Sequence, residues 1–173
     1  QYKFNCLFYC SVLLRANIQH NCGVYIGWDK KDTTLLGPSQ YTIHIADSMF
    51  NSVSYSNFFF FICNNNDTID SVDFTIEFVT KNAIVKKAFS SFRILPPPLR
   101  TKLTKTDFFF TLAKNKPVER VLQYVEVPFC ELVKENVKFE PSEINTIRFI
   151  FDKSDSGEII LDKLGLNRID INN

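Results

Sequence analysis

Residues 152–163, DKSDSGEIILDK, carry oxygen-bearing side chains at the spacing of a calcium-binding loop. Asp152, Ser154 and Ser156 occupy the first, third and fifth positions, and Gly157 occupies the sixth, where such a loop turns sharply. The last position of the loop needs a glutamate that binds the ion through both oxygens, and Lys163 stands there instead. Because both flanks alternate like strands, we interpret this stretch as a β-hairpin rather than an EF-hand.

The sequence shows no motif of an established catalytic class. It lacks GxSxG, HExxH, GxGxxG, a P-loop and paired CxxC motifs. The carboxylate pairs Asp70/Asp73 and Asp152/Asp155 arise by chance in a chain with 19 acidic residues, so we expect them at solvated strand ends. His44 alternates with isoleucines, which favours a hydrogen-bonded residue on a polar face over a general base. An enzyme whose site the sequence does not reveal remains one alternative.

The five cysteines form no CxxC motif: Cys6, Cys10, Cys22, Cys63 and Cys130. If Cys6 and Cys10 share a strand, their Cα atoms are roughly 13 Å apart, too far for a disulfide. Buried free thiols are one interpretation, and a single bridge between distant strands is the other. Neither His20 nor His44 lies at zinc-ligand spacing from a cysteine, so we expect no zinc site.

Composition limits the partners of the chain. The 20 basic and 19 acidic residues give a net charge of +1 and a pI of 7.8, which argues against a nucleic-acid-binding surface. No apolar run approaches the ~18 residues that a membrane span needs. Phenylalanine, with 18 residues against 6 Tyr and 1 Trp, is expected mainly to fill a core.

Length and chain start predict the domain organisation. A chain of 173 residues suits a single domain that covers residues 1–173. The start at Gln1 indicates a processed product or a module of a larger protein. The apolar opening FNCLFYCSVLL (4–14) lacks the cleavage site of a signal peptide, and we interpret it as a first strand.

Alternation with a period of two recurs along the chain and predicts an all-β fold. The alternating runs cover residues 21–29, 40–47, 56–64, 71–80, 106–113, 120–129, 145–152 and 157–166. About eight to ten strands favour a two-sheet antiparallel β-sandwich or jelly roll. The runs 56–64 and 106–113 have no polar face, so they are expected to be central strands covered on both sides. A helical pattern is nearly absent, with one short turn expected at 141–147 and a stiff proline-rich loop at 91–107.

Alternation also assigns side chains to faces. Tyr124 and Glu126 are expected to point outward from their strand, between valines that face the core. Arg148 and Asp152 are expected to share the outward face of the strand at 145–152. The outward faces of the predicted sheets therefore mix Tyr, Arg, Asp and Glu.

The segment LQYVEVPFCELVKENVKFEPSEINTIRFIFDKSDSGEIILDKLGL (122–166) resembles the C-terminal half of galactose-binding-like β-sandwiches. VEVPF matches a strand of that family, SEINTI matches the linker that follows, and SGEIILDKLGL matches the last strand. A looser similarity begins at Val24. The chain is most similar to carbohydrate-binding modules of family 11 and to the accessory sandwiches of secreted hydrolases.

The resemblance implies a structural calcium site at Asp162. In this family the aspartate of the last strand binds calcium together with acids near the N-terminus. The opening QYKFNCLFYC has no acid at that place. The alternative role for Asp162 is therefore to accept hydrogen bonds from backbone donors at a strand end.

The resemblance also implies glycan binding. Tyr and Trp rings lie against the apolar faces of sugars in such modules, while charged and amide side chains bond to the hydroxyls. The candidate residues are Tyr124 and Glu126, Arg148 and Asp152 on the neighbouring strand, and Tyr25, Trp28 and Tyr41 near the start. Tyr25 and Trp28 have opposite parity, so Trp28 belongs either to the core or to the binding platform.

The predicted function is that of a non-catalytic carbohydrate-binding module, which attaches a secreted polysaccharide-degrading protein to a glycan. Its expected partners are a polysaccharide or oligosaccharide and a catalytic domain of the same protein. Its expected location is extracellular, and a structural calcium ion is its one possible cofactor. The alternative is a β-sandwich that serves structure or protein interaction, accessory to a hydrolase or an assembly complex.

Overall fold

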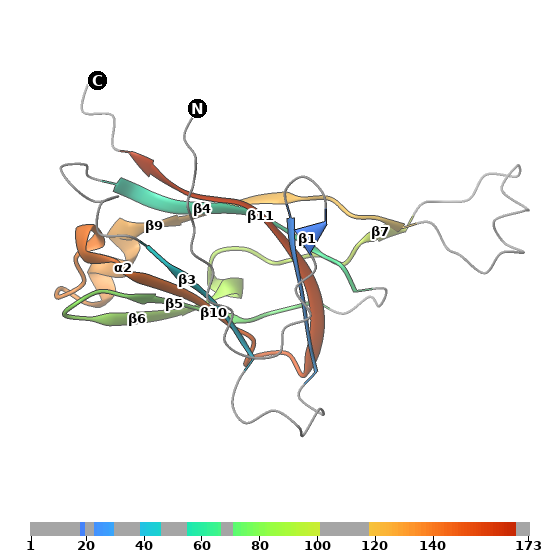
Figure 1. Ribbon diagram of the computed structural model, residues 1–173, viewed down its shortest axis with the longest axis horizontal. Coiled ribbons are helices and arrows are strands. Elements are labelled where there is room, and N and C mark those ends of the chain that lie inside the picture. Colours follow the sequence, from blue (N-terminus) through green and yellow to red (C-terminus); the bar gives the residue numbers. More distant parts are fainter. Residues whose placement is uncertain are drawn as a thin grey trace, which may run out of the picture.

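The computed structural model shows two antiparallel β-sheets that pack face to face, with a short helix at one end of the sandwich (Figure 1). The structure describes residues 18–19, 23–29, 39–45, 55–66, 71–100 and 118–168. The strands expected within residues 4–14 and 106–113 lie outside these residues. The prediction of an all-β sandwich is confirmed.

The first sheet contains five described strands, and the longest of them, β11, lies in its middle. Their spatial order is β1 (Ile18–Gln19), β2 (Gly23–Asp29), β11 (Ser156–Arg168), β4 (Tyr55–Asn64) and β9 (Gln123–Pro128). β11 pairs antiparallel with β2 along its first half and with β4 along most of its length. β11 bends along its course, so this sheet curves around one side of the molecule (Figure 1).

The second sheet contains four described strands. Their order is β3 (Gln40–His44), β10 (Thr146–Ile150), β5 (Thr75–Val79) and β6 (Ile84–Ala88). A separate two-stranded ribbon consists of β7 (Leu99–Arg100) and β8 (Val118–Glu119), each two residues long. The short helices are η2 (Phe89–Ser91), α2 (Phe129–Glu135) and η4 (Pro141–Glu143), and η4 confirms the turn expected near residue 141.

The core lies between the sheets and is rich in phenylalanine. Alternate residues of β5 and β10 point into it, as predicted, and Phe78 and Phe149 are fully buried. Phe60 meets the edge of Phe149 with ring centroids 5.4 Å apart, and Phe74 stacks on Phe89 at 4.7 Å. Each fully buried Phe side chain stabilises the fold by about 1.5–3 kcal/mol, so these rings hold the sheets together.

The predicted hairpin at residues 152–163 is wrong. β10 and β11 belong to opposite sheets, and residues 151–155 cross from one sheet to the other. Ser154 anchors the crossing, because its hydroxyl bonds to the backbone of Asp73 and its carbonyl accepts a hydrogen bond from Trp28 Nε1 at 3.2 Å. Each strand carries one apolar face, and both faces are buried when the two strands lie in opposite sheets of the sandwich.

The helix α2 was not predicted from the sequence. Its buried residues Phe129 and Leu132 are three positions apart, and the partly buried Val133 follows. This spacing suits one face of a helix, but seven residues are too few for the pattern to stand out beside the preceding strand.

Candidate functional site

Tyr124 and Glu126 lie on the outer face of the five-stranded sheet, as the alternation predicted. Tyr124 is 39% exposed, and its neighbours Val125 and Val127 are buried in the core. Across the strand pair, Tyr124 is opposite Phe61 and Glu126 is opposite Phe59. The ring centroid of Tyr124 lies 5.4 Å from that of Phe61 and 5.9 Å from that of Phe59. These three rings form one continuous surface, here called the aromatic face.

Phe59 lies over the backbone of the neighbouring strand, because the residue opposite it is Gly165. A Cβ atom at Gly165 would lie 2.6 Å from the Phe59 ring, closer than atoms can approach. The missing side chain therefore makes room for the ring to lie across the sheet. A ring in this orientation offers its apolar surface to a ligand above the sheet.

Hydrogen-bonding side chains border the aromatic face. Glu126 Oε1 accepts bonds from Asn57 Nδ2 at 2.5 Å, from Tyr124 Oη at 3.1 Å and from Asn167 Nδ2 at 3.2 Å. Asn57, Glu126 and Asn167 are here called the polar rim. The buried Oδ1 of Asn57 has no hydrogen-bond donor in the structure described here.

Tyr124 is a protonated phenol at neutral pH, as tyrosines ordinarily are. Burial, with the hydrogen bond and negative charge of Glu126, raises the pKa of Tyr124 above its usual range, although Asn167 opposes this. A protonated phenol can both donate and accept hydrogen bonds. Rings and hydroxyl-binding groups thus lie side by side on one face.

Arg148 and Asp152 do not lie on the strand that neighbours Tyr124, so this part of the prediction is wrong. β9 belongs to the five-stranded sheet and β10 to the four-stranded sheet, and their outer faces point away from each other. The sequence placed the two strands together because they follow each other along the chain. The helix α2 between them carries the chain from one sheet to the other.

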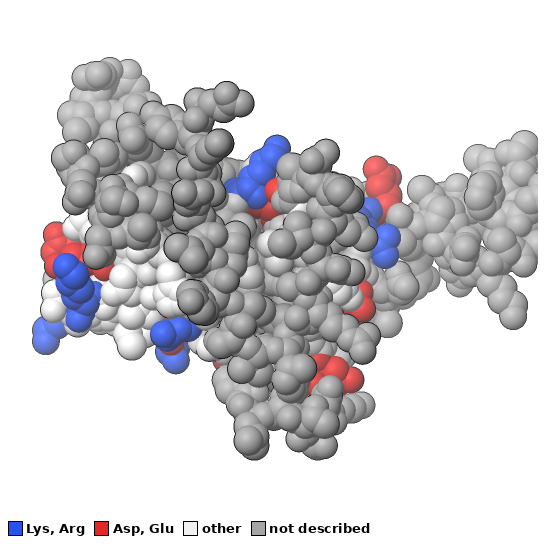
Figure 2. Space-filling model, in the orientation of Figure 1, with Lys and Arg blue, Asp and Glu red and all other residues white. Residues whose placement is uncertain are grey.

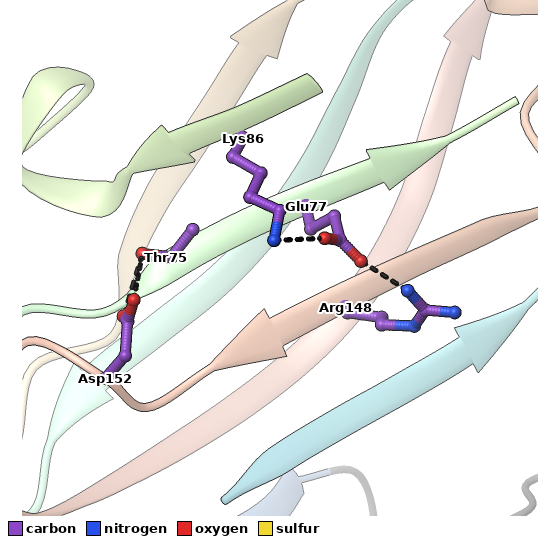
Figure 3. Close-up of polar contacts among 5 residues, drawn as sticks. All are labelled: Thr75, Glu77, Lys86, Arg148 and Asp152. Atoms are coloured by element: carbon purple, nitrogen blue, oxygen red, sulfur yellow. Dashed lines mark hydrogen bonds and ion pairs between the residues drawn. The ribbon is translucent and has the colours of Figure 1, made fainter. Parts of the chain in front are cut away.

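Arg148 belongs to a row of charges on the outer face of the four-stranded sheet (Figure 3). The carboxylate of Glu77 binds Arg148 Nη1 through one oxygen and Lys86 Nζ, at 2.9 Å, through the other. These three residues are here called the ion row. Burial raises the pKa of Glu77, but the hydrogen bonds and charges of Lys86 and Arg148 outweigh it, so the pKa lies below its usual range.

Asp152 lies at the end of the same face and accepts hydrogen bonds from Thr75 Oγ1 at 2.8 and 3.0 Å (Figure 3). His44, exposed at the end of β3, shares a 3.4 Å hydrogen bond with Thr146 Oγ1. The polar residues of this face therefore largely satisfy one another.

Trp28 and Tyr41 are core residues. Trp28 is 7% exposed and stacks on Phe151 with ring centroids 4.3 Å apart, so the core alternative for this residue holds. Tyr41 is 5% exposed and lies 6.3 Å from Phe149, so it cannot stack on a sugar as expected. Tyr25 lies on the outer face of the five-stranded sheet, on β2, two strands beyond β4.

Asp162 is 9% exposed and lies inside β11, opposite Gly23 on one side and Phe61 on the other. It is therefore not at a strand end, as the hydrogen-bonding alternative assumed. Within the described ranges, no three His, Cys, Asp or Glu side chains come together as a metal site. The opening segment, where the resemblance implied the other ligands, lies outside the described residues, so the calcium site at Asp162 stays a prediction.

The cysteines of the described residues are free. Cys63 is buried, and burial raises the pKa of its thiol, whereas Cys130 is exposed on α2. An open hollow of about 600 Å3 lies beside α2, between Asn82, Val133 and residues 137–141. Glu140 is the one carboxylate in its described lining, so this hollow does not bring catalytic acids together.

Charged side chains of both signs are mixed on the described surface. On the face shown in Figure 2, the described basic and acidic side chains are interspersed, without a continuous basic stripe. The helices among the described residues are all too short or too polar to cross a membrane.

Sequence reasoning missed four residues of this site: Asn57, Phe59, Phe61 and Asn167. The run SNFFFFICN was expected to be covered on both sides because it lacks a polar face. One side is indeed core, and the other exposes Phe59 and Phe61 in part. The alternation of Asn57 with these two phenylalanines was the available signal, but only the pairing with β9 shows that they adjoin Tyr124.

The fold is similar to that of a known carbohydrate-binding module. No protein-family model and no curated protein sequence matches the chain. Among solved structures, the family 30 carbohydrate-binding module of a cellulosomal cellulase of Clostridium thermocellum is similar, with a TM-score of 0.54 and 15% sequence identity. The match covers 86% of this chain and 75% of that module. The chain is thus a β-sandwich structurally similar to a family 30 carbohydrate-binding module.

Proposed function

We propose that the chain is a non-catalytic glycan-binding module, which binds a polysaccharide on the aromatic face. The observation that carries this proposal is the contact of three partly exposed rings, Phe59, Phe61 and Tyr124, with a hydrogen-bonding rim. The structural similarity to a cellulase module supports the same class of function. The protein that carries this module would be a secreted polysaccharide-degrading protein, with a catalytic domain elsewhere in it.

The aromatic face suits the chemistry of a sugar ring. A pyranose has apolar faces of axial C–H groups and an edge of hydroxyls, so it buries area against a flat ring and still needs hydrogen bonds. Tyr124 and Phe59 supply the flat surfaces. Glu126 and Asn167 supply charged and amide partners for the hydroxyls, and bonds to a charged partner are the stronger ones.

Tyr25 extends this surface for a longer glycan. It lies on the same outer face, and strands are about 4.8 Å apart, so it is roughly 14 Å from β9 across the sheet. We propose Tyr25 as an outlying contact. Arg148 and Asp152 lie on the opposite sheet and are no part of this binding surface.

Native affinity electrophoresis tests the proposal. The full chain would be run through β-1,4-glucan, mixed-linkage glucan, xylan, mannan and pectin. At least one neutral polysaccharide should retard the wild type, and Tyr124→Ala should lose that retardation. Val137→Ala, which shortens a side chain 92% exposed after α2, is the control and should migrate like the wild type. Migration unaffected by every polymer would contradict the proposal.

A second candidate function, protein interaction, has its own observation. Ile94, Leu99, Val121 and Leu122 are 43–74% exposed. They come from two segments of the chain that contact each other in two places. One contact is the pairing of β7 with β8, and in the other Arg93 donates hydrogen bonds to Gln123 Oε1 and to the carbonyl of Tyr124. Exposed apolar side chains gathered on adjoining segments are typical of protein contacts. A Leu99→Asp/Leu122→Asp variant that lowers self-association in sedimentation velocity, without altering glycan retardation, would favour this candidate.

A further inference from the structure

A β-bulge interrupts β11 beside the aromatic face. The pairing of β11 with β4 shifts between Asp162, which is opposite Phe61, and Gly165, which is opposite Phe59. Two residues of β11, Lys163 and Leu164, therefore face one residue of β4. A bulge redirects the side chains at its position, and bulges are frequent beside functional sites.

Lys163 adopts a backbone conformation that disfavours a lysine. Its φ is 46°, and it is the one non-glycine residue with positive φ among the residues that the structure describes. A side chain with a Cβ is strained in this left-handed region, whereas glycine and asparagine adopt it readily. The strain is thus located within the candidate binding surface.

The bulge directs the ammonium group of Lys163 over the aromatic face. Lys163 Nζ lies 5.7 Å from the centroid of the Phe61 ring, whose other neighbour is Tyr124 at 5.4 Å. The structure gives this ammonium no ion pair with a described carboxylate. Its three N–H donors are therefore open to a ligand at the height of a sugar stacked on Tyr124.

We infer that Lys163 is a binding residue of the aromatic face, on the side of its rings that leads toward Tyr25, and that it donates hydrogen bonds to the hydroxyls of a neutral glycan. This inference rests on the proposed function. The ammonium lies over the ring of Phe61, so a stacked sugar lies on Tyr124 and Phe59 instead. The hydroxyl edge of that sugar then faces the ammonium of Lys163.

The charges around Lys163 favour a neutral sugar over an anionic one. Asp162 precedes Lys163 on the same strand, and Glu126 borders the platform from β9. These two carboxylates match the ammonium of Lys163 and the guanidinium of Arg93, which binds Gln123 and the carbonyl of Tyr124, so no excess of positive charge attracts a uronate or sulfate. Glu126, which is exposed, instead accepts hydrogen bonds from hydroxyls.

Substitutions at Lys163 can separate binding from folding. Lys163→Asn removes the ammonium but keeps a residue that tolerates positive φ, so the melting temperature should not fall. Lys163→Arg keeps a cationic donor. Lys81→Asn, the same change on the exposed turn between β5 and β6 of the other sheet, is the matched control.

Isothermal titration calorimetry of the full chain with cellohexaose, xylohexaose, mannohexaose and an oligogalacturonate provides the test. Lys163→Asn should weaken binding of the preferred neutral hexasaccharide about tenfold, equivalent to about 1.4 kcal/mol. Lys163→Arg and Lys81→Asn should stay within about threefold of the wild type, and Tyr124→Ala should abolish binding.

Each of the other possible outcomes would overturn a named part of the two proposals. Wild-type affinity in Lys163→Asn, with binding lost in Tyr124→Ala, would reject the role of Lys163 and keep the proposed function. A lowered melting temperature without rescue by Lys163→Arg would make Lys163 a structural residue. Tighter binding of oligogalacturonate would overturn the neutral ligand class. No binding of any probe by the wild type would overturn both proposals.

Discussion

The outer face of the four-stranded sheet carries its charges in contact with one another, whereas the outer face of the five-stranded sheet carries rings. In the ion row, both oxygens of Glu77 are bound by cations, and the Glu77 side chain is 5% exposed. On the aromatic face, Tyr124 is 39% exposed and its hydrogen-bonding groups border solvent. Buried groups that satisfy each other stabilise a sheet, while exposed hydrogen bonds, such as those of the polar rim, can be exchanged for bonds to a ligand.

The largest expected effect comes from removing two of the three rings of the aromatic face. Phe59→Ala/Tyr124→Ala should abolish measurable glycan binding, a loss of at least about 100-fold, or about 2.7 kcal/mol, because aromatic contacts dominate such surfaces. Calorimetric titration with the preferred hexasaccharide measures it. Val137→Ala is again the control, and near-wild-type affinity in the double variant would remove the functional contrast between the faces.

The ion row should show the reverse behaviour. Arg148→Met takes one of two cations from the nearly buried Glu77, which should lower the free energy of unfolding by about 1–2 kcal/mol. This figure is below that of a fully buried pair because Arg148 is partly exposed. Urea denaturation measures it, and glycan affinity should stay unchanged. A loss of affinity in this variant would show that the four-stranded sheet also takes part in binding.

Gly165→Ala should sharpen the comparison by moving a ring without removing it. The added Cβ would displace Phe59, so glycan affinity should fall about fivefold, or about 1 kcal/mol. The free energy of unfolding should change by less than about 0.5 kcal/mol. Alanine lowers the conformational entropy of the unfolded chain relative to glycine, and this gain offsets the cost of displacing the Phe59 ring. Paired titration and urea denaturation measure both, and unchanged affinity would indicate that the ring orientation is not used in binding.

The smallest expected effect is a change in acid stability. The pKa of Glu77 lies below its ordinary value of 4.5, so its ion pairs stabilise the fold above that pH and are lost as the pH falls through the lowered pKa. Glu77→Gln lacks this contribution. Melting temperatures from pH 7 down to about pH 3 should therefore converge for wild type and variant at the acidic end. Parallel curves over the whole range would exclude a charged Glu77 as a source of stability.

Much of the fold could be predicted from alternation alone. Val125, Val127, Ile147 and Phe149 were expected in the core and are buried, and Tyr124 was expected to point outward and does. These assignments depend on the backbone of one strand, whose successive side chains point to opposite sides. Asn57, Phe59 and Asn167 could not be assigned to the site in this way, since they meet Tyr124 or Glu126 only across strand pairs.

The sequence by itself determined the class of fold, the core face of most strands and the outward position of Tyr124 and Glu126. Only the tertiary structure decided which sheet each strand joins, that β10 and β11 belong to different sheets, and that Trp28 and Tyr41 are core residues. The physical reason is that alternation is a local property of one strand. Strand pairing joins distant segments, and it depends on how all the apolar faces are buried together.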